Sequence, residues 1–277
     1  MDFELDYSEE QEEFRKEVRA WLETHVPRVE LPPDSADLTQ EHYEIGKAFR
    51  RDLGAKGWLA PTWPKEFGGG GLTADHAVVI NEELARYDIP PLGDLGLVIS
   101  APAILVHGTD EQKQRYLPEI LKGHAITWQV FTEPDAGSDL ASLKTRGVRD
   151  GDDYLINGQK QFVGTGVTPD YLYTLVNTDP TGPRHENLSA FMVPAESKGV
   201  TIQNMDLIAG GTKRFVFFDN VRVPADTLIG RENEGWWVAQ TTVSLEGGSG
   251  IDDTAYGRVK LLDLIIQYLR EGETLQS

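Results

Sequence analysis

A loop that could bind a ligand follows the apolar run at residues 126–131. Residues 132–139 read Thr-Glu-Pro-Asp-Ala-Gly-Ser-Asp, so hydroxyls and carboxylates lie next to a proline and a glycine. Proline and glycine end a strand ladder and let backbone N–H groups turn toward a bound group. Thr132 and Ser138 add short hydroxyl side chains. The pattern predicts a buried strand that opens into a ligand-facing loop.

Three glycine-containing segments predict turns. Residues 154–160 read Tyr-Leu-Ile-Asn-Gly-Gln-Lys, and Asn-Gly between extended runs is a strong hairpin signal. We therefore expect a strand, a tight turn at 157–158 and a second strand. The acidic cluster at 150–153 is typical of a solvated hairpin tip rather than a cation site. Four glycines at 68–71 lack the strand and the lysine that flank a phosphate-binding loop, which indicates a turn.

The elements that must position the 132–139 loop begin with helices. Ser8 and Gln11 have the spacing of a capping box. Four apolar residues then recur at helical intervals on one face: Phe14, Val18, Trp21 and Leu22. Further helical patterns cover 42–53, 74–86 and 111–121. Residues 1–122 are therefore predicted to form a helical N-terminal domain.

From residue 126 to 230 the pattern changes to short strands separated by turn signals. Strand-like runs lie at 171–176, 188–193, 200–205 and 215–218. We predict a β-sandwich or barrel-like middle domain over 123–235. From Trp236 onward the helical pattern returns, with an apolar stripe at Val259, Leu262, Ile266 and Leu269. Residues 236–277 are predicted to be the incomplete start of a C-terminal helical domain, which makes the fold class multidomain α+β.

Composition and charge argue against several classes of function. The 277 residues include 26 basic and 45 acidic ones, a formal charge of -19, without a basic run, so we expect no nucleic-acid binding. The absence of cysteine excludes disulfides, a thiolate nucleophile and a zinc–sulfur site, and the histidines lack metal-ligand spacing. No stretch has the apolar length of a membrane span, and the acidic N-terminus does not resemble a targeting peptide. We expect a cytoplasmic protein without a metal centre.

A series of motifs runs along the chain in a fixed order. They are Met-Asp-Phe at 1–3, Trp-Pro-Lys-Glu-Phe-Gly-Gly at 63–69, the loop at 132–139, Ile-Asn-Gly-Gln-Lys at 156–160, and Val-Arg-Val-Pro at 221–224 leading to Leu-Ile-Gly at 228–230. This series resembles the acyl-CoA dehydrogenase family, whose usual pattern is Thr-Glu-Pro-x-Ala-Gly-Ser-Asp followed by Ile-Asn-Gly-x-Lys. The resemblance implies an FAD that accepts hydride from the β-carbon of an acyl-CoA thioester. A carboxylate removes the α-proton, and an enoyl-CoA forms.

The resemblance also implies partners. Family members usually continue into a C-terminal four-helix bundle, which packs subunits together and contributes to the flavin site of a neighbour. We therefore expect this chain to carry part of the usual site and to act in a homo- or hetero-oligomer with an acyl-CoA dehydrogenase-like chain. The implied substrate is an acyl-CoA, and the implied electron acceptor is an electron-transfer flavoprotein.

By the resemblance, the cofactor contacts fall on two segments. The first carries Gln129, Phe131 and Thr132, with the Thr132 hydroxyl and nearby N–H groups at the pyrimidine end of the flavin. Donors there favour electron acceptance because reduction places negative charge on that end. Gly137 and Ser138 match the approach to the flavin diphosphate and to the substrate. An alternative stays open, in which the Thr132 hydroxyl caps its own loop.

In the second segment the chain departs from the family pattern. The family commonly has Trp and then Thr or Ser near the central flavin ring, where this chain has Phe162 and Gly164. Phe162 could still supply an apolar face, whereas Gly164 offers no hydroxyl unless Thr165 takes that place. The alternative for Phe162 is a core residue of a strand at 161–163.

The catalytic base implied by the resemblance is Glu246. Some family members carry their Glu on the helix that begins near residue 240, and Ser-Leu-Glu-Gly at 244–247 falls there. Such a base needs a pKa raised by burial to act near neutral pH, and the alternative is a solvated carboxylate at a helix start. Ser138, Glu246 and Gly247 are the predicted substrate contacts. The glycine-rich run 247–250 is a poor helix former.

Three other interpretations fit the same residues. A flavin-dependent oxidase or monooxygenase on this scaffold would use the room that Gly164 leaves for oxygen. A non-catalytic structural subunit would complete the active site of a partner. A fragment of an ordinary enzyme would lack its helical bundle. The glycine-rich segment beside Glu246, together with a half-populated site in a mixed oligomer, is compatible with bulky acyl groups such as steroid side chains.

Overall fold

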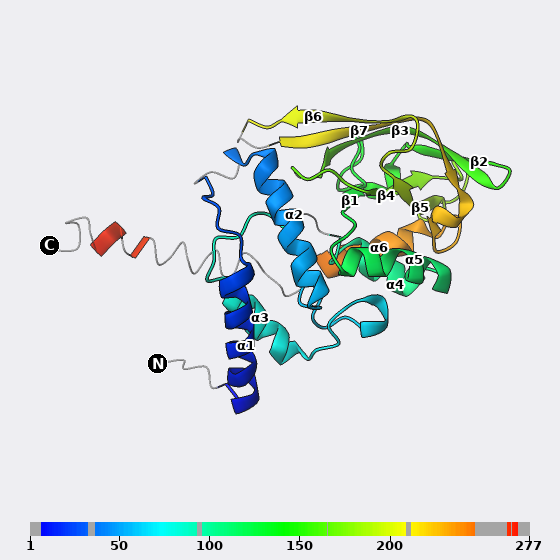
Figure 1. The fold of residues 1–277 in the computed structure, drawn as a ribbon. Helices are drawn as coiled ribbons and strands as arrows, with labels where there is room; N and C mark the ends of the chain where they lie inside the picture. Colours follow the sequence, from blue (N-terminus) through cyan, green and yellow to red (C-terminus); the bar gives the residue numbers. More distant parts are fainter. Residues whose placement is uncertain are drawn as a thin grey trace.

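A computed structural model describes residues 7–32, 37–92, 96–164, 166–208, 212–246, 265–266 and 268–270. The helices of the first part of the chain lie along one side of a β domain formed by the middle part (Figure 1). Helix α6 (Gly235–Glu246) returns to this side and packs against α4 and β5. Within the described residues, no helix is long and apolar enough to cross a membrane.

The helices that precede the first strand are α1 (Glu9–His25), α2 (Gln40–Ala55), α3 (Ala74–Leu84), α4 (Ser100–His107) and α5 (Asp110–Leu121), with a 3₁₀ turn, η2 (Lys65–Phe67), after α2. The predicted capping box starts α1, because the Gln11 N–H donates to Ser8 Oγ at 3.2 Å and the Ser8 N–H donates to Gln11 Oε1 at 2.8 Å. Val18 and Leu22 are fully buried against α2 and α3 residues. The apolar face predicted for this helix is therefore confirmed.

The sequence patterns do not predict α4. Its Ser-Ala-Pro-Ala-Ile-Leu-Val-His sequence shows no polar stripe, because much of the helix is inside the molecule. The buried residues are Ser100, Ala101, Ala103 and Ile104. A proline in the first turn is tolerated since no intrahelical partner is needed there. Burial on several sides removes the amphipathic period that identifies the other helices.

The β domain contains β1 (Thr127–Val130), β2 (Arg146–Asp150), β3 (Asp153–Val163), β4 (Tyr171–Asn177), β5 (Leu188–Pro194), β6 (Val200–Asp206), β7 (Thr212–Pro224) and β8 (Leu228–Ile229). Their order in the sheet is β6-β7-β3-β2-β4-β5-β8, and β1 pairs with β4 in parallel. The other long pairings are antiparallel. This eight-stranded sheet confirms the predicted β middle domain, while the exact boundaries at 122 and 235 stay predictions.

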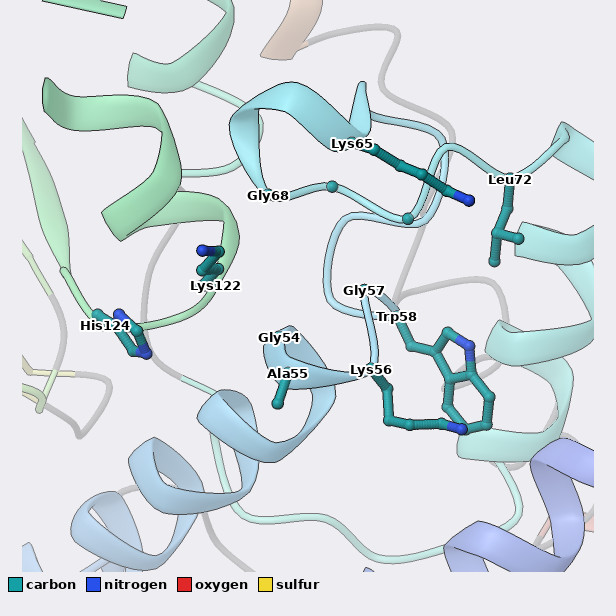
Figure 2. Close-up of a pocket in the computed structure, with 12 residues that line it drawn as sticks. Gly54, Ala55, Lys56, Gly57, Trp58, Lys65, Gly68, Leu72, Lys122 and His124 are labelled. Atoms are coloured by element: carbon teal, nitrogen blue, oxygen red, sulfur yellow. The ribbon is translucent and has the colours of Figure 1, made fainter. Parts of the chain in front are cut away.

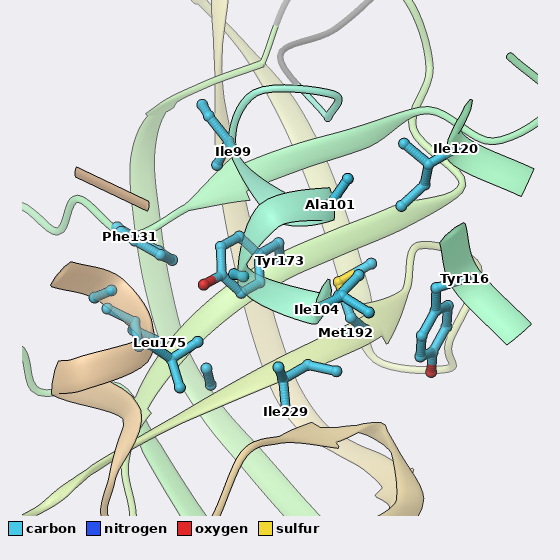
Figure 3. Close-up of a cluster of buried hydrophobic side chains, with 14 of the residues drawn as sticks. Ile99, Ala101, Ile104, Tyr116, Ile120, Phe131, Tyr173, Leu175, Met192 and Ile229 are labelled. Carbon is cyan, nitrogen blue, oxygen red and sulfur yellow. The ribbon is translucent and has the colours of Figure 1, made fainter. Parts of the chain in front are cut away.

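Two apolar clusters cover the two faces of the strands. One lies between strands and contains Trp128, Val163 and Val216. The other joins α4, α5 and α6 to β4 and β5, and Figure 3 shows Ile104, Tyr173 and Met192 in it. Strands buried on both faces read as continuous apolar runs, as β4 and β5 do. Strand β1 thus lies between two packed layers, and Phe131 and Ala136 anchor the start of the loop that follows it.

The hairpin predicted at Asn157 and Gly158 is wrong. Strand β3 runs straight through both residues, and the turn lies at 150–153, where Gly151 has φ +66°. A two-residue type I′ turn needs positive φ at both central residues, and Asn157 does not have it. Pairing of β3 with the long strand β7 prevails instead, with a register shift between Ile156 and Gly158. The Asn-Gly pair marks a β-bulge, whereas the acidic cluster is the hairpin tip that its composition predicts.

Candidate functional site

The loop after β1 is held by a tight turn of its own backbone. The Glu133 N–H donates to the Ala136 carbonyl at 2.8 Å, and the Ala136 N–H donates to the Glu133 carbonyl at 3.2 Å. Phe131 and Ala136 are buried, Thr132 is half-buried, and Gly137 and Ser138 are exposed. The loop therefore presents Thr132, Gly137 and Ser138 outward from a fixed base.

A buried ion pair lies beneath this loop. Lys160 Nζ on β3 donates to Glu133 Oε1 at 2.9 Å, to the Phe131 carbonyl at 3.1 Å and to the Leu175 carbonyl at 2.7 Å. The Lys160 side chain is fully buried, and that of Glu133 is 5% exposed. Each of the three ammonium protons thus has an acceptor, which is the condition under which a buried charge is tolerated.

The pKa values of Lys160 and Glu133 are shifted by burial and by their mutual attraction. Burial lowers the pKa of the Lys160 ammonium to about 8, against the opposing effect of Glu133. For Glu133 burial acts to raise the pKa, but Lys160 and the N–H groups of Lys144 and Thr145 outweigh it, so the carboxyl pKa is lowered. The contacts are those of a charged pair, because both Glu133 oxygens accept hydrogen bonds and Lys160 Nζ donates three.

Phe162 has an unusual backbone and an exposed ring. It lies at φ +57°, at a register shift between β3 and β7 that covers Lys160 to Val163. Its side chain is 53% exposed. The alternative of a core residue is therefore wrong, because the bulge turns the ring out of the strand. A bulky residue in the left-handed region is a genuine outlier, and such outliers concentrate at functional sites.

Gly164 follows the bulge and touches Trp128 of β1. It has φ +73°, and a Cβ atom there would lie 2.5 Å from two atoms of the Trp128 ring. Its carbonyl accepts from Lys213 Nζ at 3.2 Å. Packing against Trp128 thus excludes a side chain at this position. The expectation that Gly164 leaves room for oxygen is wrong for this space, because the Trp128 ring fills it. Thr165, the possible substitute, lies outside the described residues.

The two predicted segments are joined directly. The Gln161 N–H donates to the Thr132 carbonyl at 2.9 Å, and Gln161 Nε2 donates to the Glu133 carbonyl at 3.3 Å. Gln129 on β1 is half-buried, on the opposite face of the strand from Trp128. The structure thus brings the loop after β1 and the bulge of β3 to one place.

The candidate base and its neighbour are placed only in part. Glu246 is the last residue of α6, and its side chain lies outside the described part of the chain, as does Gly247. The helix itself is anchored to the β domain, because Thr242 Oγ1 lies 3.1 Å from the buried Tyr173 hydroxyl. A second contact joins Thr241 Oγ1 to His107 Nε2 of α4 at 2.8 Å.

A cavity of about 590 Å³ lies away from these residues, beside the ends of α2 and α5 (Figure 2). The predicted glycine turn lines it, with positive φ at Gly68. Lys56 and Lys122 also line it and are the C-caps of α2 and α5, where a cation offsets the negative helix end. Among the predicted flavin and substrate residues that the structure describes, none lines the cavity. Within the described chain, no group of three or more potential metal ligands occurs.

Sequence reasoning missed Glu133, Lys160 and Trp128 as parts of the site. Glu133 and Lys160 both stand within the quoted motifs, so the residue types were visible. Glu133 and Lys160 lie 27 residues apart and meet only because β3 continues past Gly158 to Lys160. The predicted hairpin ended the strand at Asn157 and therefore concealed this pairing. The sequence indicated Trp128 only as an apolar residue of a strand, without its contact to Gly164.

A helical domain followed by a β domain, with this loop at the end of β1, is the architecture expected of an oxidoreductase of the acyl-CoA dehydrogenase type. Residues 8–124 match the acyl-CoA dehydrogenase N-terminal domain, and residues 129–221 match the acyl-CoA dehydrogenase middle domain. The chain belongs to the acyl-CoA dehydrogenase family.

Relatives and solved structures agree with this assignment. The chain is 35% identical to acyl-CoA dehydrogenase FadE26 of Mycobacterium tuberculosis over 84% of its own length and 59% of FadE26. It is 37% identical to acyl-CoA dehydrogenase IpdE1 of the same organism, over 86% of this chain and 63% of IpdE1. A structure of the Tcur3481-Tcur3483 steroid ACAD has a TM-score of 0.80 at 31% identity, covering 100% of this chain and 71% of that one. The chain thus spans about three fifths of those two curated relatives.

Proposed function

We propose that this chain takes part in FAD-dependent α,β-dehydrogenation of an acyl-CoA thioester to the trans-2-enoyl-CoA. The observation that carries the proposal is the direct contact between the loop after β1 and the bulge of β3. The loop contributes the half-buried Thr132, and the bulge contributes the exposed ring of Phe162. The Gln161 hydrogen bond to the Thr132 carbonyl holds the two sides together.

The residues present fit an FAD. No atom lies within 4 Å of a Cβ built on Gly137, so this chain itself does not require glycine there, and the space is free for an approaching group. The exposed Phe162 ring offers an apolar face. Gln129, Phe131, Thr132 and the N–H groups of the loop would face the flavin, with Ser138 toward the diphosphate and substrate. Bound FAD would supply the hydride acceptor of the reaction.

Position 164 is the point at which this chain differs from the usual site. Gly164 leaves no side-chain donor near the central flavin ring, and only Thr165 remains as a hydroxyl in that segment. The missing donor keeps a flavin-dependent oxidase or monooxygenase as a second candidate, although Trp128 fills the side-chain space beside Gly164. Fast oxidation of the reduced protein by oxygen would identify the second candidate, and slow oxidation would favour the dehydrogenase.

Proton removal in the proposed reaction falls to Glu246. Its place at the end of α6 puts it on an element anchored to the β domain by Tyr173 and Thr242. Burial against the acyl chain would raise the pKa of this carboxyl and make it a base near neutral pH. Gly247 would give the substrate room beside it. The Glu246→Gln variant is expected to keep FAD and lose turnover.

We further propose a site completed by a second chain, in a homo- or hetero-oligomer. Supporting this, similar solved structures include the ChsE4-ChsE5 complex from Mycobacterium tuberculosis, with a TM-score of 0.69 at 33% identity. The proposed electron acceptor is an electron-transfer flavoprotein, and the proposed location is the cytoplasm. The steroid ACAD among the similar structures supports a bulky, steroid-derived acyl group.

Native mass spectrometry of protein purified without added cofactor tests the proposal. About one FAD per chain in a homo-oligomer would support self-sufficient catalysis. FAD bound only with a different chain present would identify a half-site or a structural subunit. Absence of FAD under both conditions would contradict the proposal. Thioester assays then compare short, branched and steroid-derived acyl groups, and a preference for short linear chains would exclude the bulky substrate.

A further inference from the structure

The Lys160–Glu133 pair connects the two segments on which the proposed flavin site depends. Its carboxylate end accepts from the far end of the loop, taken here as the whole connection 131–145 between β1 and β2. The Lys144 N–H lies 2.6 Å from Oε2 and the Thr145 N–H 2.9 Å from Oε1. Its ammonium end binds the Phe131 carbonyl, the last residue before Thr132. The pair therefore fixes both ends of the loop to β3.

The same lysine stands at the start of the bulge. Lys160 is paired in register with Val216 of β7, and the register shift that turns Phe162 outward begins immediately after it. Its ammonium also binds the Leu175 carbonyl on β4. Because Lys160 Nζ is fixed to three acceptors, two in the loop after β1 and one on β4, the backbone at 161–162 has little freedom to slide along β7.

We propose that Lys160 and Glu133 are positioning residues, which set the spacing between the Thr132 loop and the Phe162 bulge and thereby shape the face on which the flavin binds. The inference rests on the proposed function for the identity of the ligand. Neither side chain reaches the surface, so neither touches the cofactor itself. A buried pair with every partner satisfied holds a geometry more firmly than apolar contacts, because partial rupture leaves an uncompensated charge.

Hydrogen exchange on the full chain tests the positioning role without any cofactor. In Lys160→Met and Glu133→Gln we expect the amides of Lys144 and Thr145 to exchange at least tenfold faster. Glu83→Gln is the matched control, since it also breaks a buried ion pair but lies between α1 and α3. Unchanged exchange in the loop, or an equal rise in the control, would overturn the proposal.

The double variant Lys160→Met/Glu133→Gln separates positioning from stability. Neutralising both partners avoids a lone buried charge, so it is expected to be more stable than Lys160→Met and to fold if that variant does not. The loop amides should nevertheless exchange as fast as in the single variants, because the ammonium that joins Phe131, Glu133 and Leu175 is gone. Recovery of slow exchange along with stability would contradict a positioning role.

FAD titration completes the test. We expect the dissociation constant for FAD to rise at least tenfold in the double variant, with a changed visible flavin spectrum, and to stay unchanged in Glu83→Gln. Wild-type affinity and spectrum in the double variant would overturn the proposal. If the wild-type chain binds no FAD alone or with a partner, the proposed function fails, while hydrogen exchange still decides whether the pair orders the loop.

Discussion

The buried carboxylate of Glu83 gives a prediction about acid stability. It is 1% exposed and accepts from Arg19 Nη2 at 2.9 Å, Arg15 Nη1 at 3.1 Å and Arg86 Nη1 at 3.2 Å. Burial acts to raise its pKa, but the hydrogen bonds from Arg19, Arg15 and Arg86 lower the pKa to about 2. Two of these arginines lie on α1, so the carboxylate ties α1 to α3.

The magnitude and its sign follow from the two pKa values. The change from 4.5 in the unfolded chain to about 2 corresponds to about 3 kcal/mol, at roughly 1.4 kcal/mol per pKa unit. Because the folded pKa is the lower one, this stability is fully present above pH 4.5. It is lost as the pH falls from 4.5 toward 2. Glu83→Gln should therefore be less stable by about 3 kcal/mol at pH 7 and nearly equal to wild type at pH 2.

Urea unfolding between pH 2 and pH 7 measures this difference. The control is Glu13→Gln, which removes an exposed ion pair with Lys16 and should change stability by less than about 0.5 kcal/mol at every pH. A Glu83→Gln difference below about 0.5 kcal/mol, or one that does not shrink on acidification, would refute the reasoning.

Three further substitutions test packing around the proposed flavin site. Gly164→Ala should destabilise the protein by at least about 1–3 kcal/mol, because φ is +73° and the added methyl would meet Trp128, and unfolding by urea measures the loss. Gly137→Ala should change stability by less than about 0.5 kcal/mol, since its space is open, yet weaken FAD in a titration; unchanged affinity would exclude a flavin at that place. Tyr173→Phe should cost about 1 kcal/mol in thermal unfolding through the lost bond to Thr242, and no change would show that the bond does not anchor α6.

Periodicity and capping predicted most of the fold, for identifiable reasons. The capping box at Ser8 is local, and the apolar stripe of α1 depends only on one buried face. Helix α4 was not predicted, because a helix buried on several sides has no alternation of apolar and polar faces in its sequence. The Asn157-Gly158 turn failed because a local signal competed with the long partner strand β7, which no short window contains.

In the candidate site, too, some features can be predicted from the sequence and others depend on the fold. Thr132, Ser138 and Phe162 stand in motifs that can be read from the sequence. The contact between Gly164 and Trp128 joins residues 36 positions apart, and only the fold shows that a side chain is excluded there. Chemistry carried by single residues is visible in a sequence, whereas the pairs that position those residues are not.

Backbone strain gives an independent indication of where the binding face lies. Among the described residues, the non-glycine positions with positive φ are Phe162, His185, Asn220 and Asn233. Asn and His are enriched in this conformation, whereas a Phe is an outlier. Strain of this kind persists only when the surroundings impose it, and here they include the adjacent Lys160 ion pair. A strained aromatic residue whose ring is 53% exposed is the kind of residue expected at the flavin face proposed above.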